Sequence, residues 1–203
     1  MQNSKIKNII FDLGGVLFRR DPKKCTPDFI DFFAFVRFPK MPLFWEEYDR
    51  GTYSLDEVID LLCREKGVSR EQCVEYVRLA IDKQEEIAPT EALIRDLKGA
   101  GYRLYVLSNM SREFIDFLRT RPVYRSFDGE VISCEEHVVK PEPRIYQIIK
   151  ERYELQGEEC LFIDDRRENI EAAEREGIGG FWFDRDHPEK ACAELREQLL
   201  GQQ

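Results

Sequence analysis

The sequence has few of the residues that build zinc sites and disulfide frameworks. It contains only two histidines, His137 and His187, and its six cysteines form no Cys-x-x-Cys pair. Zinc centres use such pairs or closely spaced histidines, and disulfide scaffolds are typical of small secreted chains. Neither is expected here, and the cysteines are predicted to be free thiols.

Long apolar runs and an excess of positive charge are also missing. No run approaches the roughly 20 apolar residues that cross a bilayer, and the N-terminal residues Met1 to Lys7 lack the apolar segment of a signal peptide. The formal net charge of -9 argues against nucleic acids and anionic membranes as partners. We therefore expect a cytoplasmic protein, monomeric by default, whose partner is a small molecule. A local positive site remains compatible with an anionic substrate.

What is present predicts an α/β core. Hydrophobic residues make up 42% of the 203 residues, enough for one core domain with a smaller insert. Helical patterns separate the later apolar runs, which predicts a Rossmann-like parallel sheet covered by helices on both faces. The strands are expected at Ile6 to Phe11, Leu104 to Leu107, Cys160 to Ile163 and Gly180 to Phe183, with a weaker one at Gly129 to Ser133.

The region from residue 18 to residue 87 has a different pattern, with no convincing strand. Ser54 and Glu57 form a capping box before one amphipathic helix, and Ser69 and Gln72 resemble a second box. An aromatic run at 29–38 is interpreted as the core of this region. We predict a helical cap at 18–87 inserted into a core formed by 1–17 and 88–203, with Thr90 capping the first helix after it.

Polar residues follow the predicted strands where each strand ends. Asp12 follows the first, Ser108 and Asn109 end the second, and Asp164 and Asp165 end the next strong strand. Each signal alone is also compatible with an ordinary turn or helix cap. Because the carboxyl ends of parallel strands meet at one edge, where ligands bind in open α/β sheets, these groups are expected to meet.

Lys140 completes the set of residue types that metal-assisted phosphoryl transfer needs. Lys140 and Pro141 precede a predicted helix, so the lysine can reach an anion at the same sheet edge. The reaction needs a carboxylate nucleophile, carboxylates for a metal, a hydroxyl donor and a cation. An adjacent acidic pair of oxygen ligands suits Mg²⁺.

In this order the motifs resemble those of the haloacid dehalogenase superfamily. They are Phe-Asp-Leu-Gly-Gly-Val-Leu from Phe11, Val-Leu-Ser-Asn from Val106, Lys-Pro-Glu-Pro-Arg-Ile-Tyr from Lys140, and Phe-Ile-Asp-Asp from Phe162, closing on Asn169. The Asp-Asp-x-x-x-Asn form resembles subfamily IA, and the chain is similar to the branch with bacterial α-glucose-1-phosphate phosphatases. The resemblance extends to Tyr48-Asp49-Arg50-Gly51 in the predicted cap.

The resemblance implies a magnesium-dependent phosphatase for a small phosphorylated substrate. Asp12 would attack phosphorus, form an aspartyl-phosphate and bind Mg²⁺ together with the Gly14 carbonyl and Asp165. Asp164 would support the metal's waters or join its ligands. The remaining implied roles are phosphoryl binding by Ser108 and the Asn109 amide, charge stabilisation by Lys140, and ordering of the last loop by Asn169.

Gly14 departs from the superfamily pattern, since most of its phosphatases place a second aspartate, the general acid and base, at this position. Losing such a group costs about 10²–10⁴-fold in rate. One alternative is a substrate with a better leaving group, such as a sugar 1-phosphate. Another is a substitute acid, a water or a residue of the cap or hinge; polar candidates are Arg19, Arg20, Asp21 and Glu46.

Two further alternatives change the class of function. The protein is either a catalytically weak relative that binds a phosphorylated ligand, or a dehalogenase-type hydrolase that attacks carbon. Dehalogenases need no metal and lack the acidic pair, so the retained Asp164 and Asp165 favour phosphate chemistry. Trp45 and Tyr48 are predicted to line the cap side of the cleft.

Overall fold

The computed structural model describes residues 6–36 and 41–201. Its centre is a sheet of five parallel strands in the order β5-β4-β1-β6-β7, so that β1 lies between β4 and β6. The predicted strands are thereby confirmed, with ends shifted by one or two residues. They are β1 (Asn8–Phe11), β4 (Arg103–Ser108), β5 (Gly129–Ile132), β6 (Cys160–Asp164) and β7 (Gly179–Trp182).

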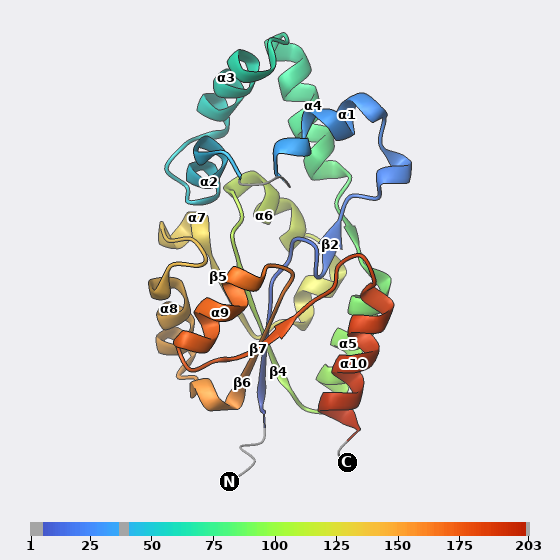
Figure 1. The fold of residues 1–203 in the computed structure, drawn as a ribbon, viewed down its shortest axis with the longest axis vertical. Coiled ribbons are helices and arrows are strands. Elements are labelled where there is room, and N and C mark those ends of the chain that lie inside the picture. The colour runs from blue at the N-terminus through green and yellow to red at the C-terminus, as the bar shows by residue number, and fades with distance from the viewer. Residues whose placement is uncertain (1–5, 37–40, 202–203) are drawn as a thin grey trace.

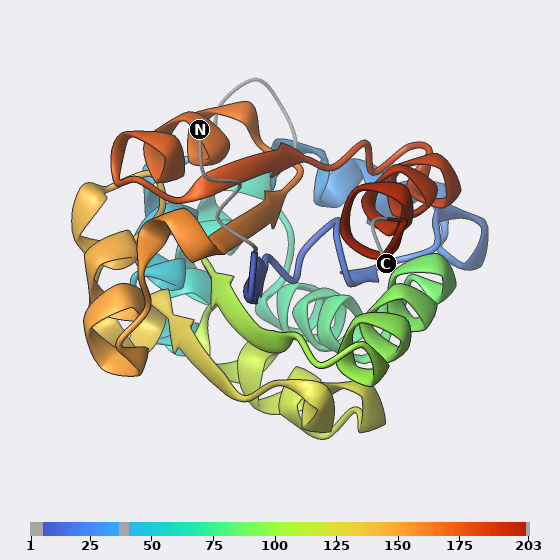
Figure 2. The ribbon, with the colours of Figure 1, turned by 90° about the horizontal axis from the view of Figure 1, so that it is seen from below.

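Helices cover both faces of this sheet, as predicted (Figure 2). Alternate strand residues face opposite sides, so Ile9 and Phe11 join one buried cluster and Ile10 joins the other. The first face packs against α5 (Ala88–Gly99), α6 (Arg112–Arg119) and α10 (Pro188–Leu200). The second packs against α8 (Pro143–Tyr153) and α9 (Arg167–Arg175). Short helices complete the core: α7 (Ser133–Glu136), η3 (Pro122–Ser126) and η4 (Gly157–Glu159).

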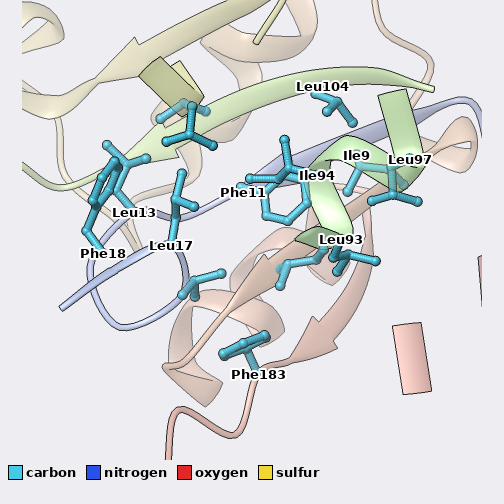
Figure 3. Packing of buried hydrophobic residues seen from close by; sticks show 14 of the residues in the cluster. Ile9, Phe11, Leu13, Leu17, Phe18, Leu93, Ile94, Leu97, Leu104 and Phe183 are labelled. Carbon is cyan, nitrogen blue, oxygen red and sulfur yellow. The ribbon is translucent and has the colours of Figure 1, made fainter. Parts of the chain in front are cut away.

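The turn after β1 is part of the hydrophobic core. Leu13 and Leu17 lie in the same cluster as Phe11 and the inner side chains of α5 (Figure 3). The amide of Leu17 donates to the carbonyl of Leu13 at 2.9 Å, which closes the turn. Packing on this scale leaves few alternative backbone positions, so the residues of the turn have a defined direction.

A helical insert occupies residues 18–86, between the turn and α5, and lies at the end of the molecule opposite the start of β1 and the end of α10 (Figure 1). It has its own buried cluster, which includes Phe29, Trp45 and Leu62. The boundaries at 18 and 87 stay a prediction, and Phe38 of the aromatic run lies outside the described residues. Its elements are β2 (Phe18–Arg19), η1 (Pro22–Lys24), α1 (Pro27–Phe32), η2 (Ala34–Val36), α2 (Leu43–Asp49), α3 (Leu55–Lys66), α4 (Arg70–Asp82) and β3 (Glu85–Glu86).

Two local predictions for this part of the chain were wrong. The insert does contain strands, because β2 and β3 pair in antiparallel fashion where the chain leaves and re-enters the core. A two-residue strand is too short to show a period, so no sequence pattern marks it. Thr90 does not cap α5: Ile87 is the N-cap, Pro89 lies in the first turn, and Thr90 is fully buried.

The two predicted capping motifs of the insert are confirmed. The capping box of Ser54 and Glu57 begins α3, and the Ser69 side chain accepts the N–H of Gln72 at the start of α4. All six cysteines are free thiols, four of them buried. Within the described residues no helix combines the length and apolarity needed to span a bilayer.

Candidate active site

Three neighbouring strands bring the predicted polar residues to one edge of the sheet. Asp12 follows β1 directly, Ser108 is the last residue of β4, and Asp164 is the last residue of β6. The register pairs Phe11 with both Val106 and Ile163, so Asp164 lies level with Asp12 and Ser108 lies one residue further along its strand. All three polar side chains are buried, with Asp12 7% exposed and the other two fully enclosed.

Lys140 lies between two of these carboxylates. Its ammonium donates to Asp12 Oδ1 at 2.8 Å and to Asp164 Oδ2 at 2.6 Å. Ser108 Oγ donates to the same Asp12 oxygen at 2.8 Å. One Asp12 oxygen is therefore held by two donors, which directs the carboxylate and leaves its second oxygen available to a ligand.

Asp164 and Lys140 are each positioned by amide groups. Asn169 Nδ2 lies 3.1 and 3.0 Å from the two Asp164 oxygens, and the Arg166 amide donates to Asp164 Oδ1 at 2.8 Å. The Asn109 side chain donates to the Lys140 carbonyl at 2.9 Å and accepts the Lys140 amide at 2.7 Å. Its side-chain amide is thus occupied in holding the lysine backbone.

The electrostatics of the site reflect this crowding. Burial lowers the pKa of Lys140, but the charges of Asp12 and Asp164 outweigh it and hold the pKa above its ordinary value. Burial and then the charge of Asp12 raise the pKa of Asp165, while Arg185 acts against them at 3.0 Å. Burial likewise raises the pKa of Asp164 against the pull of Lys140. Buried carboxylates with raised pKa values favour the binding of an added cation.

The same residues form an acidic cluster. One carboxylate oxygen from each of Asp12, Asp164 and Asp165 lies within 4.8 Å of the others. Lys140 is the buried cation between Asp12 and Asp164, and Asp165 pairs with the half-exposed Arg185 at 3.0 Å. Hard oxygen donors in this number fit Mg²⁺, which takes few protein carboxylates and keeps several waters.

Gly15 is required by this arrangement. Its φ is +82°, and a Cβ at this position would lie 2.6 Å from Asp165 Oδ2. The close approach of the backbone to Asp165 therefore needs a residue without a side chain.

Gly15→Ala is expected to destabilise the protein. A non-glycine residue in the left-handed region costs about 1–2 kcal/mol, and the loss here should be larger because the Asp165 carboxylate must also move. Urea unfolding measures this loss. Gly67→Ala is the matched control, since Gly67 has φ +65° with open space around it. Equal losses in the two variants would contradict the expectation.

A cavity of about 310 Å³ lies where the helical insert meets the sheet edge. Its core side includes Asp12, Gly14, Lys140 and Asp165. From the insert and its connections come Phe18, Arg19, Arg20, Pro22, Val36, Met41, Trp45, Asp49 and Gln84. Known ligand pockets span about 300–1,000 Å³, so this cavity suits a small molecule.

The cavity agrees with some of the sequence predictions and not with others. Trp45 lines it as predicted, whereas Tyr48 packs in the aromatic core of the insert and donates to Glu113 at 2.6 Å. Arg19 and Arg20 line it, but Asp21 and Glu46 do not. Asp21 caps η1, and Glu46 pairs with Arg50 at 3.4 Å.

Sequence reasoning missed several cavity residues. Arg166 and Arg185 add positive charge to the core side, and Met110 and Phe114 add apolar surface. Asp49 belongs to the Tyr-Asp-Arg-Gly motif of the insert, which by itself indicates no role for it, and it lines the cavity while only 8% exposed. Arg166 had one signal in the sequence, since it directly follows the acidic pair. Nothing in the sequence marks Arg185, Met110 or Phe114.

Comparison with known proteins agrees with the geometry. The chain is 28% identical over 198 residues to a sesquiterpene phosphatase of Aspergillus oryzae, covering 96% of this chain and 97% of that protein. It is 24% identical over 198 residues to an (S)-2-haloacid dehalogenase of a Pseudomonas species, covering 89% and 83%. A HAD family enzyme of Bacteroides thetaiotaomicron, solved with magnesium and inorganic phosphate, superposes with a TM-score of 0.69 at 26% identity, covering 87% and 93%.

A family model covers most of the chain and accounts for the motifs at the sheet edge. The model of haloacid dehalogenase-like hydrolases matches residues 6–177, from the first strand through the Asp164 loop to the end of α9. With a parallel sheet, an insert after β1 and the acid–lysine cluster at its edge, the chain belongs to the haloacid dehalogenase-like hydrolases.

Proposed function

We propose that this protein is a magnesium-dependent phosphatase that hydrolyses a small phosphate monoester through an aspartyl-phosphate on Asp12. The observation that carries the proposal is the directed Asp12 carboxylate, held by Ser108 and Lys140 beside two further acids. The phosphatase relative and the neighbour with magnesium and phosphate support it.

The residues around the acidic cluster fit a magnesium ion. Asp12, the Gly14 carbonyl and Asp165 would hold it, and Asp164 would stay with Lys140 and Asn169, which already occupy its oxygens. When bound, the ion would offset negative charge on the phosphoryl group and polarise it. An Arg185 side chain lies 3.0 Å from Asp165 Oδ2 and would keep that carboxylate in place.

The remaining groups would position and stabilise the phosphoryl group. Asp12 would attack phosphorus in line with the leaving oxygen, and Lys140 would offset charge that develops next to Asp12. With the phosphoryl group bound, the Ser108 hydroxyl would turn from Asp12 and donate to a phosphoryl oxygen, as would the backbone amide of Asn109. The Asn109 side chain is engaged with Lys140, so its role would be to hold the lysine.

The organic part of the substrate would face the helical insert, which we propose acts as a lid that excludes water. The apolar wall of Val36, Met41 and Trp45 supports an ester with an apolar portion. The lack of a carboxylate at Gly14 instead supports a reactive leaving group, as in a sugar 1-phosphate. The charge balance and the free thiols support a monomer acting on small molecules in the cytoplasm.

The test is phosphate release by the purified protein with and without Mg²⁺. The substrate panel includes sugar 1-phosphates and 6-phosphates, an isoprenoid alcohol phosphate and nucleotides. Halide release from a 2-haloacid is measured in parallel, because a dehalogenase relative exists. Metal-dependent turnover of a phosphate ester supports the proposal. Halide release without metal, or ligand binding without turnover, would replace it by one of the alternative functions.

Magnesium is expected to stabilise the folded protein. Binding at 100 times the dissociation constant adds about 2.7 kcal/mol, which for a chain of this size raises the melting temperature by about 5–10 °C. Thermal unfolding with Mg²⁺ and with a chelator measures the shift. Asp165→Asn is expected to reduce it, and an unchanged shift in that variant would place the ion elsewhere.

A further inference from the structure

The position that normally supplies the proton in this reaction has no side chain here. A Cβ at Gly14 would have no described atom within 4 Å, so the space for a carboxylate is open. Cleavage of an unreactive ester still requires a proton for the leaving oxygen. Another group in the same cavity must supply it if such esters are substrates.

Asp49 is a carboxylate that the insert contributes to the lining of that cavity. It is the last residue of α2 and lines the cavity together with Asp12 and Trp45. No ion pair of the described residues includes Asp49, although its side chain is buried. A buried carboxylate without a salt-bridge contact is unfavourable for folding, and such groups concentrate at functional sites.

Contacts with the core hold this segment of the insert in place. The Ser133 hydroxyl donates to the Asp49 carbonyl, and Arg50 pairs with Glu142 at 2.7 Å. Gly51, with φ +78°, packs so closely on Cys134 that a Cβ would lie 2.5 Å from the Cys134 carbonyl oxygen. These contacts fix the backbone at and after Asp49 and so give it a defined position in the cavity lining, as general acid–base chemistry requires.

Charged groups from several elements act on the Asp49 carboxyl. Burial is the largest effect and raises its pKa, and the charges of Asp12 and Glu46 add to it. Arg166 and the Ser111 backbone N–H act in the opposite direction. Together they raise the pKa of Asp49 to about 7. Both protonation states are therefore populated near neutral pH, which is the condition for a group that donates and then accepts a proton.

We infer that Asp49 is the general acid and base of this site, an assignment that rests on the phosphatase function proposed above. In the first step an Asp12 oxygen bonds to phosphorus, and the bond from phosphorus to the leaving oxygen breaks. The leaving oxygen keeps that electron pair and takes the Asp49 proton, which releases an alcohol. In the second step water attacks phosphorus, Asp49 takes a proton from the water, and the bond from phosphorus to Asp12 breaks. Phosphate leaves, and both carboxyl groups return to their starting states.

The test compares benzyl phosphate with p-nitrophenyl phosphate in Asp49→Asn. Benzyl alkoxide needs a proton to leave, whereas nitrophenolate does not. We expect kcat/KM for benzyl phosphate to fall about 10²–10⁴-fold and that for p-nitrophenyl phosphate to fall less than about tenfold. Because Asn cannot activate water, nitrophenol should appear as a burst followed by slow turnover. The wild-type kcat/KM for benzyl phosphate should decline as the pH rises through about 7, and this decline should be absent in the variant.

Two further variants separate catalysis from structure. Glu47→Gln removes a carboxylate from the same helix that accepts a hydrogen bond from Arg50 and does not line the cavity. It should leave kcat/KM for both substrates unchanged. Gly14→Asp in the Asp49→Asn background places a carboxylate in the open space and should restore benzyl phosphate hydrolysis. The Asn variant should stay folded, because removing a buried acid with a raised pKa relieves a destabilisation that grows with pH.

The outcomes distinguish this inference from the function on which it rests. Equal losses for both substrates, or no loss for benzyl phosphate, would overturn the role of Asp49 while leaving the phosphatase intact. A wild-type protein that hydrolyses neither ester with Mg²⁺ would overturn both. Selective loss on benzyl phosphate with rescue by Gly14→Asp supports the assignment.

Discussion

Asp12→Asn is expected to lower phosphate-ester hydrolysis by about 10⁴-fold or more, as removal of a covalent nucleophile or its partner does in other hydrolases. Asparagine keeps the size of the side chain but has no anionic oxygen to attack phosphorus. It also loses the ion pair with Lys140 at 2.8 Å. Phosphate release measures turnover, and trapping of the phosphorylated protein measures formation of the intermediate. Both signals should disappear.

The control for this variant is Asp96→Asn. Asp96 is an aspartate of α5 that pairs with Arg196 at 2.8 Å on the surface, and its loss should leave activity unchanged. Exposed pairs of this kind contribute at most about 1 kcal/mol. If Asp12→Asn keeps activity within about tenfold of the wild type, the reaction barrier has risen by no more than about 1.36 kcal/mol. That small a change would be incompatible with Asp12 as the nucleophile.

Lys140→Met is expected to have a large effect on stability as well as on activity. Lys140 is the cation between Asp12 and Asp164, and its side chain is 2% exposed. Removing one partner of a buried ion pair costs about 3–5 kcal/mol, because a charge is left uncompensated. For a chain of this length the melting temperature should fall by about 6–20 °C. Differential scanning calorimetry measures the fall.

The dependence on pH and metal identifies the cause of that loss. Without Lys140 the buried Asp164 loses the charge that lowers its pKa, so the pKa of Asp164 rises further and the folded state binds a proton more readily than the unfolded chain. The deficit should therefore shrink at acidic pH and grow toward neutral pH. Mg²⁺ should restore part of the stability.

The control for this variant is Lys98→Met. It removes an exposed pair with Asp128 at 2.6 Å and should change the free energy of unfolding by no more than about 1 kcal/mol. Similar losses in both variants would contradict the assigned role of Lys140.

Much of the fold was predictable because its signals are local. Strand-length apolar runs marked all five strands of the main sheet, and capping residues marked α3 and α4. Parallel connectivity then brings Asp12, Ser108 and Asp164 to one edge, whatever the details of packing. The strands β2 and β3, which pair where the chain leaves and re-enters the core, carry no sequence signal because two residues show no period.

The family, the sheet and the acid–lysine cluster follow from the amino-acid sequence, because topology brings the strand ends together and the side chains there set the chemistry. Which groups of the insert face that cluster is seen only in the folded chain. Trp45 and Asp49 line the cavity, while Tyr48, between them on α2, packs in the insert's core. The tertiary structure also turns the Asn109 side chain toward Lys140. These positions depend on how an insert docks on a distant sheet edge, through contacts such as Arg50 with Glu142, and no local pattern encodes them.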